Sequence, residues 1–218
     1  DSQPPWTWHA HLVRPGSYMN IDRRAALDRE DLLARARSIR DEAHGTRTTY
    51  SPKVFIPLTM LCRDRCGYCT FAQPPARLDS PYLDQTEVLR IAEAGAAAGC
   101  HEALFTLGER PDLRYPAAAQ WLEAHGHQST VEYLAEISRK VLDETGLLPH
   151  SNAGALHEDE LALLRTVAPS QGMMLESLVP DLDCHRGAPD KTPRRRLATL
   201  EAAGQMAIPC LLYTSPSP

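Results

Sequence analysis

The stretch CRDRCGYC, residues 62–69, places three cysteines within eight residues and determines how the rest of the chain is interpreted. The other three cysteines, Cys100, Cys184 and Cys210, are isolated along the chain. Disulfides between such close neighbours need a tightly constrained turn and would leave one thiol over. The charged residues 63–65 indicate a polar, accessible loop and not a core. The clustered cysteines therefore predict metal ligands, and the isolated ones predict small, mostly buried side chains.

Two kinds of metal centre fit three thiolates on one short loop. Zinc needs a fourth ligand in a closed tetrahedral site, usually from a second ligand pair, and the nearest candidates are Cys100 and His101. An iron–sulfur cluster is favoured, because cysteine thiolates are its usual ligands. Three cysteines on a four-iron cluster leave one iron open, which indicates chemistry. A zinc-stabilised binding module remains the alternative.

Short apolar strands alternate with helical patterns on both sides of the cysteine loop. Strands are predicted at residues 53–58, 103–107, 147–150, 172–175 and 206–211. Helices are predicted at residues 28–44, 87–98, 129–145, 158–167 and 193–204, with a further short helix opened by Pro116. In the third of these helices, Ser129 and Glu132 have the spacing of a capping box. Pro57 would weaken the first strand as a central strand unless it lies at the strand end.

This order of elements predicts an α/β fold. Apolar strands that alternate with helices indicate a parallel sheet with helices outside it. Polar residues follow several of the strands, at 62–69, 108–109, 150–152 and 176–177. In a parallel barrel the loops after the strands share one end, where active sites form. With only five strands, the predicted (βα) barrel is partial and incomplete at its C-terminus.

The cysteine loop resembles the signature of the radical S-adenosylmethionine (SAM) superfamily, C-x3-C-x2-C with an aromatic residue before the last cysteine. Here the motif consists of Cys62, Cys66, Tyr68 and Cys69. The resemblance implies a partial (βα) barrel of the radical SAM type and a 4Fe–4S cluster on the three cysteines. It also implies that SAM binds the open iron through its amino and carboxylate groups.

Four other segments resemble a narrower group, the ring-closing half of the 7,8-didemethyl-8-hydroxy-5-deazariboflavin (FO) synthases. They are VFIPLT at 54–59, EALFTLGERP at 102–111, LLPHSNAG at 147–154 and RLATLEAAG at 196–204. The resemblance runs from about Tyr50 to Pro209. The cysteine motif alone indicates only the superfamily, so the narrower assignment depends on these segments.

The resemblance also implies roles for cofactor-binding residues. Gly108 and Glu109 resemble the second-strand motif that binds the SAM amino group, and Tyr68 is the aromatic residue of the cysteine motif. Glu176 stands where the fourth strand commonly supplies a polar side chain to the ribose. Arg196 resembles a residue that pairs with the SAM carboxylate.

Each of these residues also has a structural interpretation. Glu109 would cap its turn with Arg110, Glu176 would pair with a nearby arginine, and residues 194–196 would be a solvated helix start. Arg196 differs from its neighbours because it precedes Leu197, which is expected to be buried. His150 and Asn152 are expected to contact the substrate, or else to satisfy backbone groups of their loop.

The implied reaction begins with one-electron reduction of the cluster and cleavage of SAM to methionine and a 5′-deoxyadenosyl radical. The radical abstracts hydrogen from an adduct of a tyrosine-derived hydroxybenzyl group with 5-amino-6-ribitylaminouracil. Ring closure with loss of ammonia gives the deazaflavin. The implied partners are this small-molecule substrate, an electron donor and the tyrosine-coupling half of the synthase, separate or fused. The alternative is a related radical SAM enzyme of menaquinone, thiamine or hydrogenase-maturation pathways.

The chain is expected to comprise three parts: an N-terminal extension with a helix (1–49), the radical SAM core (50–209) and a non-native or disordered tail (210–218). It begins with Asp1 and not with Met, which indicates a processed, trimmed or partial sequence. After Pro209 the resembled family continues with a Gly-rich strand that contacts adenine. This chain has CLLYTSPSP instead, which predicts a truncated fragment.

Composition excludes several classes of partner. The 218 residues include 23 Lys and Arg against 28 Asp and Glu, a net charge of −5, so no broad positive field favours nucleic acid or an anionic membrane. The apolar runs at 54–58 and 206–213 are too short to cross a bilayer. Residues 1–6 carry neither a basic nor an apolar segment, so no secretory signal is recognised. A soluble, cytoplasmic protein without a nucleic-acid or membrane partner is expected.

Overall fold

The structure, a computed structural model, describes residues 28–47 and 50–213. Of the described residues, 28–47 and 50 belong to one compact unit, and 51–213 belong to a second. In the described part of the first unit, helix α2 (Arg29–His44) agrees with the predicted helix. Asp28 caps its start by accepting the backbone N–H of Arg29, and Gly45 ends it at a positive φ.

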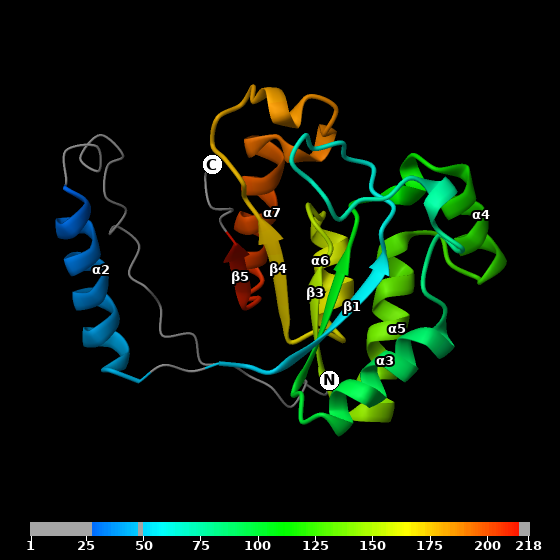
Figure 1. The fold of residues 1–218 in the computed structure, drawn as a ribbon, viewed down its shortest axis with the longest axis horizontal. Coiled ribbons are helices and arrows are strands. Elements are labelled where there is room, and N and C mark those ends of the chain that lie inside the picture. The colour runs from blue at the N-terminus through cyan, green and yellow to red at the C-terminus, as the bar shows by residue number, and fades with distance from the viewer. Residues whose placement is uncertain (1–27, 48–49, 214–218) are drawn as a thin grey trace. The chain divides into compact units, whose positions relative to one another are not determined.

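The second unit is built around one sheet of five parallel strands (Figure 1). The strands pair in sequence order: β1 (Lys53–Thr59), β2 (Glu102–Leu107), β3 (Leu148–Asn152), β4 (Ser170–Met174) and β5 (Cys210–Tyr213). Every strand therefore ends at the same edge of the sheet. This arrangement confirms the predicted partial (βα) barrel, with β1 and β5 as the two edge strands. Pro57 is accommodated because β1 is an edge strand, and the register shifts between Pro57 and Thr59.

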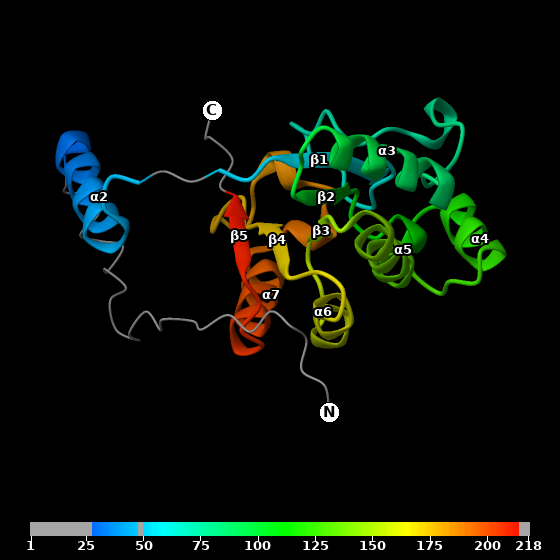
Figure 2. The same cartoon turned by 90° about the horizontal axis from the view of Figure 1, so that it is seen from below.

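Helices cover the outer face of this sheet (Figure 2). They are α3 (Gln85–Ala97), α5 (Thr130–Thr145), α6 (Glu158–Arg165) and α7 (Pro193–Gln205), while α4 (Pro116–Ala124) precedes α5. Side chains alternate between the two faces of a strand. Ile56, Phe105 and Leu134 belong to the buried core between sheet and helices. Phe55, on the inner face of β1, is 50% exposed.

The predicted capping box of α5 is only half formed. Ser129 accepts the backbone N–H of Glu132 at 3.2 Å, as expected. The Glu132 carboxylate, however, accepts the backbone N–H of Gln128 at 2.6 Å and not that of Ser129. A complete box occurs at α3, where Asp84 and Glu87 each accept the other's backbone N–H.

The predicted position of the fifth strand, residues 206–211, was wrong. Helix α7 continues past Gly204 to Gln205, and Met206 is its C-cap. Ala207 then turns at φ 51°, and the backbone N–H of Ile208 donates back to the carbonyl of Ala203 at 2.9 Å. The apolar residues at 206 and 208 thus close the helix end, and β5 begins only at Cys210. This strand opens the segment predicted as a tail, whose last residues, 214–218, lie outside the described part.

Within residues 28–47 and 50–213, no helix has both the length and the apolar character needed to cross a membrane.

Substitutions at two helical glycines test how the helices pack against the outer face of the sheet. A Cβ on the buried Gly95 of α3 would lie 2.7 and 2.8 Å from the two Cγ atoms of Val54, whereas a Cβ on Gly204 of α7 meets nothing within 4 Å. Gly95→Ala is expected to lower the free energy of unfolding by about 1–3 kcal/mol, because the strand cannot move away. Gly204→Ala is expected to raise it by up to about 1 kcal/mol through helix propensity. Urea unfolding measures both, and equal effects would contradict this account of the helix–strand contact.

Candidate functional site

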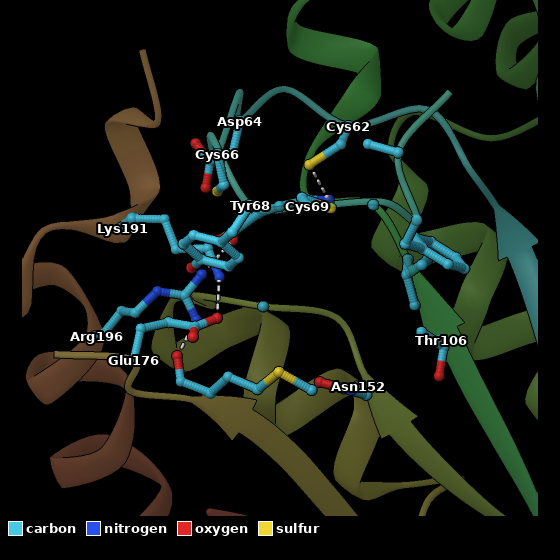
Figure 3. A pocket seen from close by; sticks show the side chains of 17 residues that line it. Cys62, Asp64, Cys66, Tyr68, Cys69, Thr106, Asn152, Glu176, Lys191 and Arg196 are labelled. Atoms are coloured by element: carbon cyan, nitrogen blue, oxygen red, sulfur yellow. Dashed lines mark hydrogen bonds and ion pairs between the residues drawn. The ribbon is translucent and has the colours of Figure 1, made fainter. Parts of the chain in front are cut away.

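A cavity of about 220 Å³ lies at the carboxyl ends of the strands (Figure 3). The cysteine loop, residues 62–69, forms one side of it. Residues at and just after the ends of β2, β3 and β4, together with Lys191 and Arg196, form most of the rest. Its lining consists of Cys62, Asp64, Cys66, Tyr68, Cys69, Phe71, Ala72, Thr106, Leu107, Gly108, Glu109, Asn152, Gly154, Met174, Glu176, Lys191 and Arg196. Of the site residues predicted from sequence, only His150 is missing from this lining.

The three cysteines of the loop are free thiols at the cavity wall. The sulfur of Cys62 also accepts the backbone N–H of Glu109 at 3.2 Å. Their sulfur atoms do not form a trio within 4.8 Å of one another, since the one such group among the described residues is made of carboxylates. A single zinc ion needs sulfur ligands at about 2.3 Å, and so needs them closer together. The donor set and its spread fit a larger iron–sulfur cluster.

The alternative zinc site is not supported. Cys100 and His101 directly precede β2, and the backbone N–H of His101 donates to the carbonyl of Pro52, just before β1. They therefore lie at the amino ends of the strands, while the cysteine loop follows the carboxyl end of β1. Neither residue is placed to complete a site with the three cysteines.

The cysteine thiols need a positive partner in order to ionise. Burial raises the pKa of Cys62 and of Cys66 to about 11. Metal ligation requires the thiolate form, so a bound metal centre must supply the compensating charge and displace the protons. The two sulfurs are thus suited to a cationic cluster and unsuited to act as free nucleophiles.

A buried ion pair lies at the base of the cavity. Arg196 is 1% exposed, and its Nη2 donates to Oε2 of Glu109 at 2.6 Å. Its Nη1 donates to the carbonyl of Met174 at 2.5 Å, and Oε1 of Glu109 accepts the backbone N–H of Ala155 at 2.6 Å. Burial raises the pKa of Glu109 to about 7, although Arg196 opposes the shift.

The geometry of this pair tests the structural interpretations of Glu109 and Arg196 that the sequence left open. Arg110 does not cap the turn with Glu109, because it pairs with Glu160 at 2.5 Å. The solvated helix start is wrong for Arg196, which is buried. The expected burial of Leu197 was also wrong, since that side chain is 38% exposed and faces away from the core. The arginine, and not the leucine, anchors this turn of α7.

Two glycines allow the close approaches around Glu109. A Cβ on Gly108 would lie 2.8 Å from the Cβ of Cys62 and 2.6 Å from the carbonyl carbon of Leu61. Gly154 has φ 78°, and a Cβ there would lie 2.7 Å from Oε2 of Glu109. Only glycine fits both positions, which brings the cysteine loop and the Glu109 carboxylate into one site.

A segment that we call the strap, residues 175–192 between β4 and α7, holds the cysteine loop. Backbone N–H groups of Gly67 and Arg65 donate to carbonyls of Cys184 and Gly187 at 2.7 and 3.0 Å. Sequence analysis missed the strap, because its contacts join residues more than a hundred positions apart.

The strap also explains two side chains of the cysteine loop. The Tyr68 hydroxyl lies 3.0 Å from Nε2 of His185. The interpretation of residues 63–65 as an accessible loop was wrong for Asp64, which is 4% exposed. Its Oδ1 accepts the backbone N–H of Asp190 in the strap at 3.1 Å. A charged side chain in a loop is therefore buried here, because the strap covers it.

Glu176 lies at the cavity directly after β4, in a left-handed backbone conformation with φ 65°. Such a conformation is unfavourable for a residue with a side chain and is often found at functional sites. Its Oε1 accepts from Lys191 of the strap at 2.5 Å, so this lysine is one of its partners.

The two residues predicted to contact the substrate, His150 and Asn152, lie in different surroundings. Asn152 lines the cavity, whereas His150, two residues earlier on the same face of β3, is fully buried below it. The Nδ1 of His150 lies 2.7 Å from Oγ of Ser170 on β4. Burial, with a smaller contribution from Lys53, lowers the pKa of His150 to about 4. Its placement supports a structural role between strands more than a contact with substrate.

Comparison with known proteins gives one family. The sequence model of the radical SAM superfamily matches residues 56–215. FO synthase of Nocardia farcinica is 47% identical over 217 residues, which cover 90% of this chain and 25% of that protein. The 7,8-didemethyl-8-hydroxy-5-deazariboflavin synthase of Methanopyrus kandleri is 48% identical over 166 residues, 74% of this chain and 49% of that protein. The chain thus spans between a quarter and a half of the length of these relatives.

Solved structures show the same fold. A maturase of the [FeFe]-hydrogenase superposes with a TM-score of 0.62 at 19% identity and covers 85% of this chain and 40% of its own. Methylornithine synthase superposes with a TM-score of 0.59 at 20% identity and covers 85% of this chain and 51% of its own. At these identities the likeness concerns the fold alone.

Gly108→Ala is expected to separate the cysteine loop from the end of β2, because the added methyl group collides with the backbone of Leu61. Protein reconstituted anaerobically with iron and sulfide should then bind little iron and lack the brown colour of a cluster. Gly67→Ala is the matched control, since its Cβ would lie 3.5 Å from Cys184, an ordinary contact. Normal iron content in Gly108→Ala would contradict the role assigned to this glycine.

The free energy of unfolding is expected to depend on pH through His150. The unfolded chain protonates this histidine near its ordinary pKa of 6.5, whereas the folded chain keeps it neutral down to about pH 4. The free energy of unfolding should therefore fall as the pH decreases from about 6.5 to 4, by up to about 3 kcal/mol. Urea unfolding across this range should show a smaller fall in His150→Gln. The exposed control His101→Gln should behave as the unmodified chain, and identical pH profiles for all three would refute the assignment.

Proposed function

Because the chain belongs to the radical SAM superfamily, we propose that it carries the ring-closing activity of an FO synthase. Its cofactors are then a 4Fe–4S cluster and SAM, and its substrate is an adduct of a hydroxybenzyl group with 5-amino-6-ribitylaminouracil. The observation that carries this proposal is the meeting of three cysteines and the buried Glu109–Arg196 pair at one cavity. The narrower substrate assignment is supported by identities of 42–48% with FO synthases.

Cys62, Cys66 and Cys69 would hold the cluster. When bound, it supplies one electron to the sulfonium of SAM, which splits into methionine and the 5′-deoxyadenosyl radical that abstracts hydrogen. The backbone N–H of Glu109 already donates to the Cys62 sulfur, and such a bond stabilises a thiolate ligand. The strap, through its bonds to Gly67 and Arg65, keeps the loop in one conformation. These contacts favour a preorganised ligand set.

The Glu109–Arg196 pair suits the amino-acid end of SAM. That end carries an ammonium and a carboxylate, and Glu109 and Arg196 offer the complementary charges side by side. Arg196 keeps its orientation through its bond to the Met174 carbonyl while it exchanges partners. The raised pKa of Glu109 reflects a buried carboxylate that gains from a cationic ligand.

The remaining lining suits the rest of the cofactor and the substrate. Glu176 would accept hydrogen bonds from the ribose hydroxyls, with Tyr68 beside it at the cavity wall. Asn152 and Thr106, from β3 and β2, present an amide and a hydroxyl that match a polar ring such as uracil. About 220 Å³ is less than a typical ligand site holds, so the substrate would extend over the inner face of the sheet, where Phe55 is exposed.

The partners follow from the same proposal. The tyrosine-coupling half of the synthase would supply the adduct, and an electron donor would reduce the cluster. The relatives exceed this chain in length, which leaves room for such a second half in a parent protein.

A chimaeric enzyme tests this function. Residues 50–209 of this chain replace the matching segment of the Nocardia farcinica FO synthase, which supplies the remainder of the barrel and the coupling half. Given tyrosine, 5-amino-6-ribitylaminouracil, SAM and a reductant, the chimaera is expected to release 5′-deoxyadenosine and to form the fluorescent deazaflavin. Both products are measured by chromatography.

Matched cysteine variants control the experiment. Cys69→Ala should abolish both products, because a cluster ligand is lost. Cys100→Ala, at the opposite end of the sheet, should keep both. Release of 5′-deoxyadenosine without deazaflavin would sink the substrate assignment and favour a related pathway. Unchanged activity in Cys69→Ala would refute the cluster assignment.

A further inference from the structure

Three buried carboxylates meet at the cysteine loop, next to the cavity. Asp64, Glu109 and Asp190 each offer one oxygen, and these oxygens lie within 4.8 Å of one another. The residues come from three separate segments: the cysteine loop, the end of β2 and the short 3-10 helix η4 (Pro189–Lys191) of the strap. All three are at least nine-tenths buried, so water does not screen their mutual repulsion.

Four of their six oxygens accept hydrogen bonds, and one is buried without a partner. Glu109 accepts from Ala155 and Arg196, Asp190 accepts from Arg63 at 3.3 Å, and Oδ1 of Asp64 accepts from the backbone of Asp190. Oδ2 of Asp64 is buried without any hydrogen-bond partner. An unpaired carboxylate oxygen removed from water is strongly unfavourable. A cation or hydrogen-bond donor bound among the three carboxylates would therefore stabilise this oxygen.

The charges around the cluster do not balance. When all three carboxylates are ionised, two guanidinium groups, Arg63 and Arg196, balance two of the charges and leave one negative charge. Lys191 also acts on Asp64, and Arg110 on Glu109 and Asp190, but each of these cations is already paired with a carboxylate of its own, Glu176 and Glu160. A buried net charge is unfavourable without a partner. One further positive charge would neutralise this group of three carboxylates.

We propose that Asp64, Glu109 and Asp190 form a binding site for one alkali-metal cation, sodium or potassium. Carboxylate oxygens are ligands for hard cations, and the set contains no sulfur or imidazole that would favour a transition metal. A divalent ion would exceed the single charge left over, whereas a monovalent ion matches it. The cation joins the cysteine loop, β2 and the strap at one point, and so orders the loop before an iron–sulfur cluster assembles on the cysteines.

This site shares Glu109 with the SAM site of the proposed function, but the cation does not depend on bound SAM. The amino-acid end of SAM is a zwitterion, so it brings no net charge to the pair of Glu109 and Arg196. The charge left over by Asp64 and Asp190 is therefore present with or without the cofactor. A test of the cation needs neither SAM nor a product.

Thermal unfolding of the iron-free chain tests the proposal at fixed ionic strength. The chloride salts of sodium, potassium and tetramethylammonium are compared, because the last cation is too large for the site. We expect the melting temperature to be higher in sodium or potassium by about 2–4 °C. Asp64→Asn should remove this difference, and Asp79→Asn, an exposed carboxylate on a neighbouring loop, should keep it.

Three results would overturn the proposal. They are equal melting temperatures in all three salts, an alkali effect that persists in Asp64→Asn, and stabilisation by magnesium in the absence of any alkali effect.

Crystals of the unmodified chain in rubidium chloride give a second measurement that does not depend on the folding of a variant. An anomalous peak between the three carboxylates would support the site, and a well-ordered but empty cluster would refute it. Neither measurement involves SAM or a product, so an inactive chimaera would count against the proposed function alone.

Discussion

The buried ion pair between Glu109 and Arg196 is the interaction on which the site depends. Two charges removed from water are stable only when their geometry is good and their other bonding positions are filled. Here the carboxylate also accepts from the backbone of Ala155, and the guanidinium Nη1 also donates to the carbonyl of Met174 and the sulfur of Met173. Only Nε of Arg196 is buried without a partner in this pair. The pair thereby fixes the ends of β2 and β4, the start of α7 and the turn after β3 relative to one another.

The backbone of Glu109 extends this constraint to the cysteine loop. Its carbonyl accepts the N–H of Arg63 at 2.7 Å, and its own N–H donates to the Cys62 sulfur. These bonds require the loop to lie against Gly108, where no side chain fits. One residue therefore orients a charged group towards the cavity with its side chain and a metal ligand with its main chain. A change at Gly108 or Glu109 affects both functions together.

Much of the fold follows from the sequence, because short apolar runs between helical patterns are typical of parallel strands, even where one face is partly exposed, as at Phe55 of β1. Residues 53–58 and 103–107 are read correctly for that reason, and the parallel order then places the polar ends of β1 to β4 at one edge. The fifth strand was misplaced, because the apolar residues Met206 and Ile208 close the C-terminal end of α7 and do not belong to a strand. Local pattern does not distinguish these two uses of an apolar residue.

The site was less predictable than the fold, for a related reason. Motif spacing identifies Cys62, Cys66 and Cys69, but the burial of Asp64 depends on Asp190, which lies 126 positions further along the chain. Charge in a loop normally indicates exposure, and only the strap reverses that expectation. The same holds for Arg196, whose burial is decided by a glutamate 87 positions away. Sequence thus shows which groups are able to do chemistry, whereas burial and pairing of charges emerge only when the strands bring distant loops together.

That distinction bears on how the cavity works. The residues that sequence motifs identify are the ones expected to touch a cofactor, and they line the open side of the cavity. Among the residues that sequence missed, Asp64 and Asp190 join the cysteine loop to the strap, whereas Lys191 pairs with Glu176 within the strap. Three exposed thiols on a free loop would adopt many conformations, and ordering them would cost entropy each time a metal centre assembled. A strap joined to the loop by backbone bonds and buried charges bears that cost during folding, so the ligand set is ordered before it is used.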